Sequence, residues 1–163
     1  MLSRTLMAAL AVAASSPAHA LCMYHGVYNV KTSLEQEFRD SRWVVRAHVV
    51  SADYHWSDED ESWTLYRLKV VQRFKGKLPD RFTFFTQRNS GGFYMDGPGA
   101  TPDLDGDYLL FLSGSPRAGD PAAARGALWV NYNCGQSKSW SRVSQDDLKR
   151  LRLLASRRRT ATH

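Results

Sequence analysis

Hydrophobic and polar residues alternate most regularly along residues 63–74. Positions 66, 68, 70 and 74 carry Tyr, Leu, Val and Phe, whereas positions 67, 69 and 73 carry Arg or Lys. A period of two directs alternate side chains to opposite faces of a strand. The segment is therefore predicted to be a half-buried β-strand with one apolar face.

Four further strands are predicted from their aromatic and β-branched composition, at residues 43–53, 81–86, 107–113 and 127–132. Residues 57–62 and 75–80 are short polar turns between them. Residues 88–106 and 114–126 are longer and rich in Gly, Pro and other small residues, which indicates loops.

Helix signals occur before the first strand and after the last. Ser33 and Gln36 have the spacing of a capping box, and Leu34 and Phe38 give the following turn an apolar face. Ser144 precedes a segment with two Asp residues in its first turn, which complement the positive end of a helix dipole. Its apolar stripe consists of Leu148, Leu151 and Leu154 or Ala155.

The order of these elements predicts a mainly β fold. Strands and helices do not alternate, which argues against a parallel sheet. Five antiparallel strands with a short N-terminal helix and a C-terminal helix suit a small barrel such as the OB-fold. Four aromatic residues are predicted to fill the barrel core rather than to stack on a ligand: Tyr66, Phe82, Phe84 and Trp129.

Residues 1–20 are predicted to be a signal peptide. One positive charge precedes an apolar run over residues 6–14, and Ala18-His19-Ala20 has the small-x-small form that signal peptidase cleaves. The run is too short to span a membrane. We therefore expect cleavage between Ala20 and Leu21, export to the periplasm or the outside, and no transmembrane segment in the mature chain.

The two cysteines are predicted to form a disulfide, because two cysteines of an exported protein usually pair in an oxidising compartment. Cys22 is the second residue of the predicted mature chain, and Cys134 lies near its far end. Closing a loop of about 110 residues contributes roughly 4 to 5 kcal/mol in chain-entropy models. A nucleophilic thiol or a metal ligand is the alternative, although no His stands at ligand spacing from Cys134.

The formal net charge of +6 is concentrated at the C-terminal end, and the rest of the mature chain is close to neutral. We predict a domain over residues 21–156 and a basic, disordered tail over residues 157–163. The cations of this end either complement the helix dipole or contact an anionic partner: Lys149, Arg150, Arg152, Arg157, Arg158 and Arg159. A second candidate contact is the acidic run Asp58, Glu59, Asp60 and Glu61, for which a solvated turn is the simpler interpretation.

Several segments together resemble the bacterial members of the tissue-inhibitor-of-metalloproteinases-like, or netrin-like, family. Besides the early cysteine and the short helix, they are residues 40–50, 70–76, 78–79, 106–111 and 133–135. The resemblance covers residues 22–154. It implies an OB-fold barrel with a C-terminal helix, which agrees with the strand count.

The sequence departs from the animal inhibitors at its N-terminus. Those proteins chelate the protease zinc through an N-terminal cysteine in a Cys-Xaa-Cys segment and use six cysteines in the domain. Here Leu21 is the predicted first residue, Cys22 is the second, and Tyr24 stands where a second cysteine would be. Zinc-directed inhibition is therefore an alternative that rests on analogy of fold.

No motif predicts catalysis, a cofactor or a bound metal. The acidic turn at residues 103–107 lacks the Gly and Glu positions of an EF-hand loop, and residues 89–92 lack the framework of a serine protease. His25, His48 and His55 are too scattered to predict a metal site.

These features predict an exported, non-enzymatic binding module, monomeric, that contacts a protein partner or an anionic envelope component. The loops at 57–62, 88–106 and 114–126 and the basic tail would provide the contacts. Nucleic acid is not expected as a partner because the chain is exported. The alternatives are a metalloprotease inhibitor and an envelope enzyme with an unrecognised site.

Overall fold

The computed structural model describes residues 22–57, 62–88, 92–97, 99, 101–114 and 121–160. The predicted signal peptide, with its cleavage site at Ala20 and Leu21, lies outside the described residues. So do the acidic run at 58–61 and residues 161–163, and the side chains of Arg158 and Arg159 are not described either.

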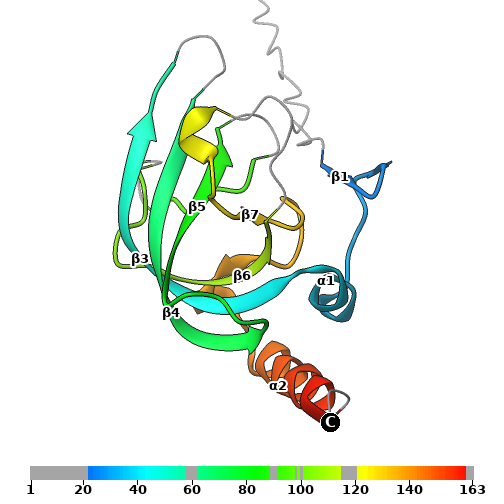
Figure 1. Ribbon diagram of the computed structural model, residues 1–163. Coiled ribbons are helices and arrows are strands. Elements are labelled where there is room, and N and C mark those ends of the chain that lie inside the picture. Colours follow the sequence, from blue (N-terminus) through cyan, green and yellow to red (C-terminus); the bar gives the residue numbers. More distant parts are fainter. Residues whose placement is uncertain are drawn as a thin grey trace, which may run out of the picture.

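Five antiparallel strands form a nearly closed barrel, as the sequence predicts (Figure 1). They are β3 (Trp43–His55), β4 (Trp63–Lys75), β5 (Arg81–Gln87), β6 (Asp107–Ser113) and β7 (Trp129–Val130), with neighbours in the order β5-β4-β3-β6-β7. Leu128 bridges the gap between β5 and β7: its amide donates to the Thr83 carbonyl and its carbonyl accepts from Phe85 N, both at 2.9 Å. This arrangement confirms the predicted mainly β class and is consistent with an OB-like fold.

The barrel interior is filled by alternate residues of the strands. Tyr66, Leu68 and Val70 of β4 are buried there, together with the aromatic ring of Phe84. Phe74 has the same parity but packs outside the barrel. The reason is a register shift between the pairs Ala47↔Val70 and Arg46↔Gln72, which inserts one extra residue into β4 and reverses the direction of the side chains after it.

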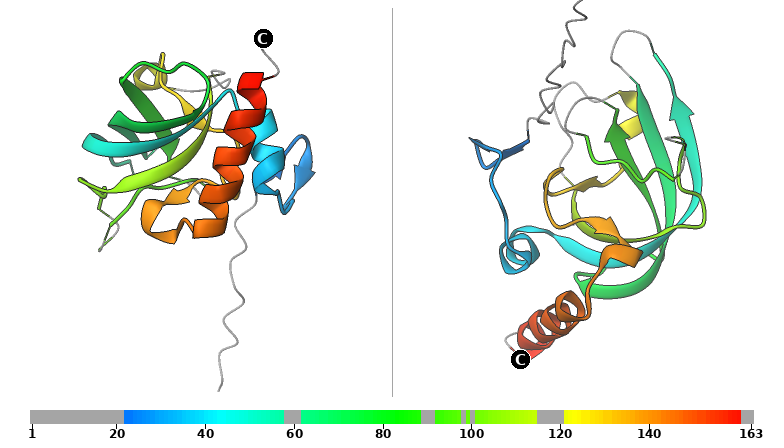
Figure 2. Two further views of the ribbon diagram at one scale, coloured as in Figure 1. Left: turned by 90° about the horizontal axis from the view of Figure 1, so that it is seen from below. Right: turned by 180° about the vertical axis from the view of Figure 1, so that it is seen from behind.

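Two helices pack side by side on the outside of the barrel (Figure 2). They are α1 (Leu34–Asp40) and α2 (Gln145–Thr160), and α1 begins after Ser33, whose hydroxyl accepts from Gln36 N as predicted. Both helices contribute to one apolar cluster with the outward-facing side chains of β3, β4 and β6. Its buried members are Leu34, Phe38, Val44, Phe74, Leu109, Phe111 and Leu151.

Several short elements have no counterpart in the predicted set: β1 (Met23–Tyr24), β2 (Val27–Tyr28), β8 (Lys138–Ser139) and the 3₁₀ turns η2 (Ala122–Ala124) and η3 (Trp140–Arg142). Each has two or three residues, too few to show a periodicity. The last barrel strand is also shorter than its predicted range. At the other end, α2 includes residues 157–160, which the sequence placed in the tail.

Neither helix of the described residues combines the length and the hydropathy that crossing a membrane requires.

Candidate functional site

The disulfide predicted from the sequence is present and joins the two ends of the domain. Cys22 and Cys134 are 112 positions apart, and their Cα atoms are separated by 6.0 Å. Cys22 is buried, and its carbonyl accepts from Asn29 N at 2.7 Å, which closes the β1–β2 hairpin. The hairpin is therefore anchored to the turn around Cys134 at the edge of the barrel.

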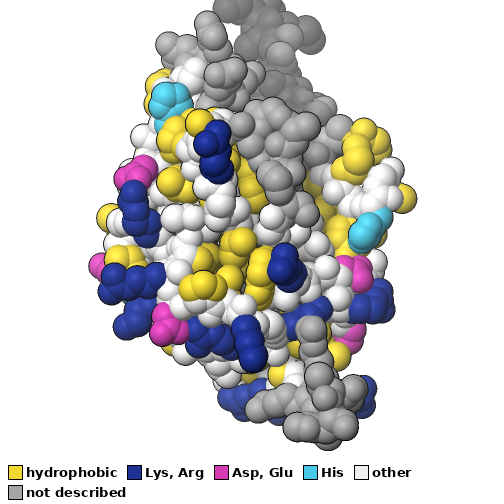
Figure 3. All heavy atoms as spheres, viewed as in Figure 1, with side chains coloured by type: hydrophobic (Ala, Val, Ile, Leu, Met, Phe, Trp, Pro, Cys, Tyr) yellow, Lys and Arg dark blue, Asp and Glu magenta, His cyan; other side chains and the backbone are white. Residues whose placement is uncertain are grey.

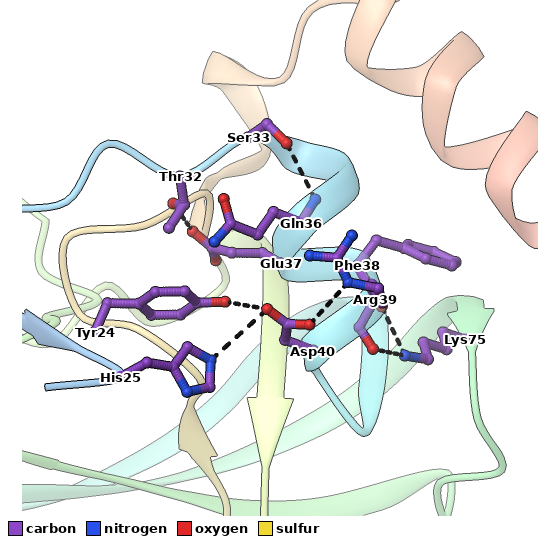
Figure 4. Close-up of polar contacts among 10 residues, drawn as sticks. All are labelled: Tyr24, His25, Thr32, Ser33, Gln36, Glu37, Phe38, Arg39, Asp40 and Lys75. Carbon is purple, nitrogen blue, oxygen red and sulfur yellow. Dashed lines mark hydrogen bonds and ion pairs between the residues drawn. The ribbon is translucent and has the colours of Figure 1, made fainter. Parts of the chain in front are cut away.

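A polar cluster attaches the same hairpin to α1 (Figure 4). The Tyr24 hydroxyl donates to Asp40 Oδ2 at 2.7 Å, and His25 Nε2 lies 3.7 Å from the same oxygen. Burial of the phenol, and then the carboxylate that it faces, raise the pKa of Tyr24 to about 12. The hydrogen bond from Tyr24 in turn lowers the pKa of Asp40.

Lys75 closes the other end of α1. Its Nζ donates to the carbonyls of Phe38 and Arg39 at 2.6 and 2.8 Å (Figure 4). It also donates to the carbonyl of Ser41 at 2.6 Å. A cation at this position satisfies carbonyls that have no partner within the helix and complements the helix dipole. The short helix is thus fixed at both ends by side chains.

Glu37 is a fully buried carboxylate of α1. Together with the contacts of Tyr24 and Lys75 it forms the anchor of the N-terminal hairpin. Its Oε1 accepts from Gln136 N at 2.8 Å and from the Thr32 hydroxyl, whereas Oε2 has no hydrogen-bond partner. Burial raises the pKa of Glu37, although these two donors oppose that shift. Gly135 packs so closely against the carboxylate that a Cβ atom there would clash with it. Position 37 lies three residues after Leu34, on the same helix face, which is the sequence signal for its burial.

The hairpin itself exposes apolar side chains. Met23, Val27 and Tyr28 are each more than half exposed. A cavity of about 410 Å³ lies beside them, and much of its lining is polar: Cys22, Met23, His25, Gly26, Asn131, Tyr132 and Asn133.

The other candidate surface is the outward face of α2, which carries most of the cations singled out in the sequence. Lys149, Arg150, Arg152 and Arg157 are all exposed there, and Leu153 among them is 50% exposed. Lys149 and Arg150 have acids at 3.7 Å, Asp146 and Glu35 respectively. Arg152 makes no ion pair with any residue that the structure describes. All six predicted cations thus belong to one helix, and the four whose side chains are described are exposed on it.

The start of α2 is fixed by reciprocal hydrogen bonds. Asp147 N donates to Ser144 Oγ at 3.0 Å, and Ser144 N donates to Asp147 Oδ2 at 3.2 Å. Lys138 Nζ donates to the same carboxylate at 3.0 Å. Partial burial tends to raise the pKa of Asp147, but these donors outweigh it and the pKa is lowered. The helix that presents the cations is therefore firmly held at its N-terminus.

The long segment after β5, predicted as a recognition loop, is fastened to the barrel through its described residues. Arg88 donates to both carboxylate oxygens of Asp96, at 3.0 and 2.6 Å, and both side chains are largely buried. The Arg88 guanidinium also lies over the rings of Tyr54 and Tyr94, at 5.0 and 4.9 Å. Such a buried, stacked ion pair restrains the segment rather than leaving it free to adapt to a partner.

His48 forms the one His–carboxylate pair that invites a catalytic interpretation. Its Nδ1 lies 2.8 Å from Asp107 Oδ1, and its Nε2 lies 3.7 Å from Asp105 Oδ1. Arg46 Nε donates to the same Asp107 at 2.7 Å. Carboxylates face both ring nitrogens, whereas the imidazole of a catalytic Ser or Cys site has a nucleophile beside one of them. Among the described residues, no three His, Cys, Asp or Glu side chains gather as metal ligands would.

No protein-family model matches the chain, and no match to a curated protein is found either. The resemblance to the inhibitor-like family therefore stays a prediction from the motifs, and the functional conclusion is drawn from the surfaces described above.

Proposed function

We propose that this protein is an exported, non-enzymatic binding module of the inhibitor-like OB-fold kind, which contacts an anionic component of the cell envelope through the outward face of α2. The observation that carries the proposal is the grouping of Lys149, Arg150, Arg152 and Arg157 around the exposed Leu153 on one helix. Export is supported by the signal sequence and by the disulfide, a bond typical of oxidising compartments.

The outward face of α2 is already formed before any partner binds. The inner side of α2 is held by Leu151, which is fully buried, and by the cap at Ser144. Binding then requires no helix formation and avoids that entropy cost. Each Lys or Arg near an anionic lipid surface contributes about 1 kcal/mol, and Leu153 can insert its side chain between headgroups.

Co-sedimentation of the mature chain with lipid vesicles tests the proposal. We expect binding to vesicles that contain phosphatidylglycerol and none to vesicles of phosphatidylcholine alone. Arg152→Ala should weaken binding about five-fold, the equivalent of about 1 kcal/mol. Lys69→Ala is the matched control, because Lys69 is exposed on β4 away from α2. Equal binding to both vesicle types, or equal loss in the two variants, contradicts the proposal.

A second candidate function is inhibition of a zinc metalloprotease by the N-terminal hairpin. The observation in its favour is that the disulfide holds Met23, Val27 and Tyr28 exposed at the edge of the barrel. Incubating the mature protein with a panel of metalloproteases, and sequencing its N-terminus by mass spectrometry, tests this function. Inhibition that is lost in a Met23→Asp variant supports it, and unchanged protease activity at micromolar inhibitor excludes it.

A further inference from the structure

A second cavity lies in the barrel wall, away from the disulfide. Its volume is about 590 Å³, within the range of sites for small organic ligands. Residues from β3, β4, β5, the turn between β4 and β5, and the segment before β7 line it: Trp43, Val50, Arg67, Leu68, Leu78, Pro79, Arg81, Phe82, Thr83, Gly126 and Leu128.

The exposure of the lining side chains increases from the bottom of the cavity to its mouth. Leu68 and Leu78 are buried, Phe82 and Leu128 are half-buried, and Val50 is 51% exposed. Hydrophobic side chains also gather near the centre of the face drawn in Figure 3, with Lys and Arg side chains around them. An apolar cavity with an open mouth favours a ligand that has a hydrocarbon part.

The charged groups of the cavity all have one sign. Arg67 and Arg81 belong to the lining, and the lining contains no Asp or Glu. Arg67 is paired with Asp53 at 2.8 Å, with both side chains about half exposed. Arg81 is exposed and makes no ion pair with the residues that the structure describes. One guanidinium beside the apolar surface is thus available to an anion.

We propose that this cavity binds a fatty acid, with the hydrocarbon chain against Leu68, Phe82 and Leu128 and the carboxylate on Arg81. Guanidinium and carboxylate groups match in shape and charge and form bidentate hydrogen bonds. A neutral hydrocarbon would leave Arg81 unused, and a cationic amphiphile would be repelled by both arginines. The absence of acids from the lining and the position of the free arginine therefore select an anionic amphiphile.

This site is independent of the surface proposed for envelope contact. Its lining includes no residue of α2, so either proposal can fail without the other. Variants in the two places separate them: Arg81→Ala alters only the cavity, whereas Arg152→Ala alters only the helix.

Equilibrium binding of laurate and dodecanol to the full mature chain tests the proposal, with both ligands below their aggregation limits. They share a hydrocarbon chain and differ in the headgroup charge. We expect saturable binding of laurate, tighter than that of dodecanol. Arg81→Ala should weaken laurate binding about five-fold and leave dodecanol binding unchanged, because it removes one charge-assisted contact. Arg152→Ala should change neither.

A second variant tests the hydrocarbon part. Val50→Trp enlarges an exposed side chain at the cavity and should weaken laurate and dodecanol binding alike, with circular dichroism confirming the fold. The proposal is overturned if laurate shows no saturable binding, if Arg81→Ala leaves laurate affinity unchanged, or if Arg152→Ala reduces it equally. Loss of vesicle binding in Arg81→Ala with no effect on laurate would show that Arg81 serves the envelope contact instead.

Discussion

The two helices pack side by side on one apolar cluster, yet their outward sides differ. The polar contacts that fix α1 are made within the molecule: Glu37 is buried, Asp40 accepts from Tyr24, and Lys75 of β4 caps the last carbonyls. On α2, Arg152 and its cationic neighbours point to solvent. The difference teaches that α1 is a structural anchor for the disulfide-linked N-terminus, whereas the outward side of α2 is exposed, and we propose that a partner contacts it there.

Removing the disulfide should have the largest effect on the anchor. Cys22→Ser combined with Cys134→Ser should lower the free energy of unfolding by about 4 kcal/mol, because the closed loop is long. Urea unfolding of the variant and of the wild type, with and without reductant, measures this change. A loss below about 1 kcal/mol would mean that the polar cluster alone holds the N-terminal hairpin.

The two faces of α2 can be compared directly with a matched pair of leucines. Leu151 is fully buried and Leu153 is 50% exposed. Leu151→Ala should cost about 2 to 4 kcal/mol in denaturant unfolding through the cavity it leaves, and Leu153→Ala less than about 0.5 kcal/mol. Leu153→Ala should instead weaken binding to phosphatidylglycerol vesicles. Equal destabilisation by the two variants would contradict the division of the helix into two faces.

Glu37 should make the folded protein less stable as the pH rises, which is opposite to the effect of a carboxylate whose pKa is lowered by folding. Its pKa is raised by burial, so the folded protein holds this proton more tightly than the unfolded chain. Stability is therefore lost as pH rises from the unfolded value of about 4.3 through the raised folded value. Glu37→Gln keeps an acceptor for Gln136 N and should be about 1 kcal/mol more stable at neutral pH, without this loss.

Unfolding of Glu37→Gln across the acid-to-neutral range checks the prediction. The Asp40 and Asp147 carboxylates, whose lowered pKa values give the opposite slope, stay intact in this variant and serve as the internal reference. An unchanged pH profile after the substitution would show that the Glu37 carboxylate is ionised without cost in the folded state.

Tyr24→Phe should have a modest effect, because it removes one hydrogen bond between the N-terminal hairpin and α1. We expect a loss of about 1 kcal/mol at neutral pH, typical of a hydrogen bond to a charged group at a partly exposed site. The raised pKa of Tyr24, about 12, also predicts that wild-type stability declines between about pH 10 and 12. Thermal unfolding at neutral and alkaline pH measures both effects, and the alkaline decline should diminish in the variant.

Much of the fold was predictable because each long strand or helix carries its own signal. The alternation along β4, the cap at Ser33 and the pairing of Cys22 with Cys134 all reflect local chemistry or a small number of possible partners. Residues 107–113 even match the bounds of β6. The register shifts of β4 were not predictable, because a bulge depends on the neighbouring strand and not on the local alternation of the sequence.

The candidate sites were harder to predict. The cations of α2 are visible in the sequence because they follow one another closely. The second cavity brings together Trp43, Arg81 and Leu128, which become neighbours only after the barrel closes. From its composition the segment around Glu35 and Glu37 resembles an exposed helix surface. The spacing of Glu37 from Leu34 is the one feature of the sequence that indicates its burial.

The most direct test of the central claim is NMR of the labelled mature chain bound to phosphatidylglycerol bicelles that contain a spin-labelled lipid. Amide signals close to the lipid are broadened by the label. We predict the strongest broadening at Arg152, Leu153 and Arg157, and little broadening along α1. Strongest broadening at the hairpin, residues 23–28, or no broadening at all, would contradict the assignment of α2 as the contact surface.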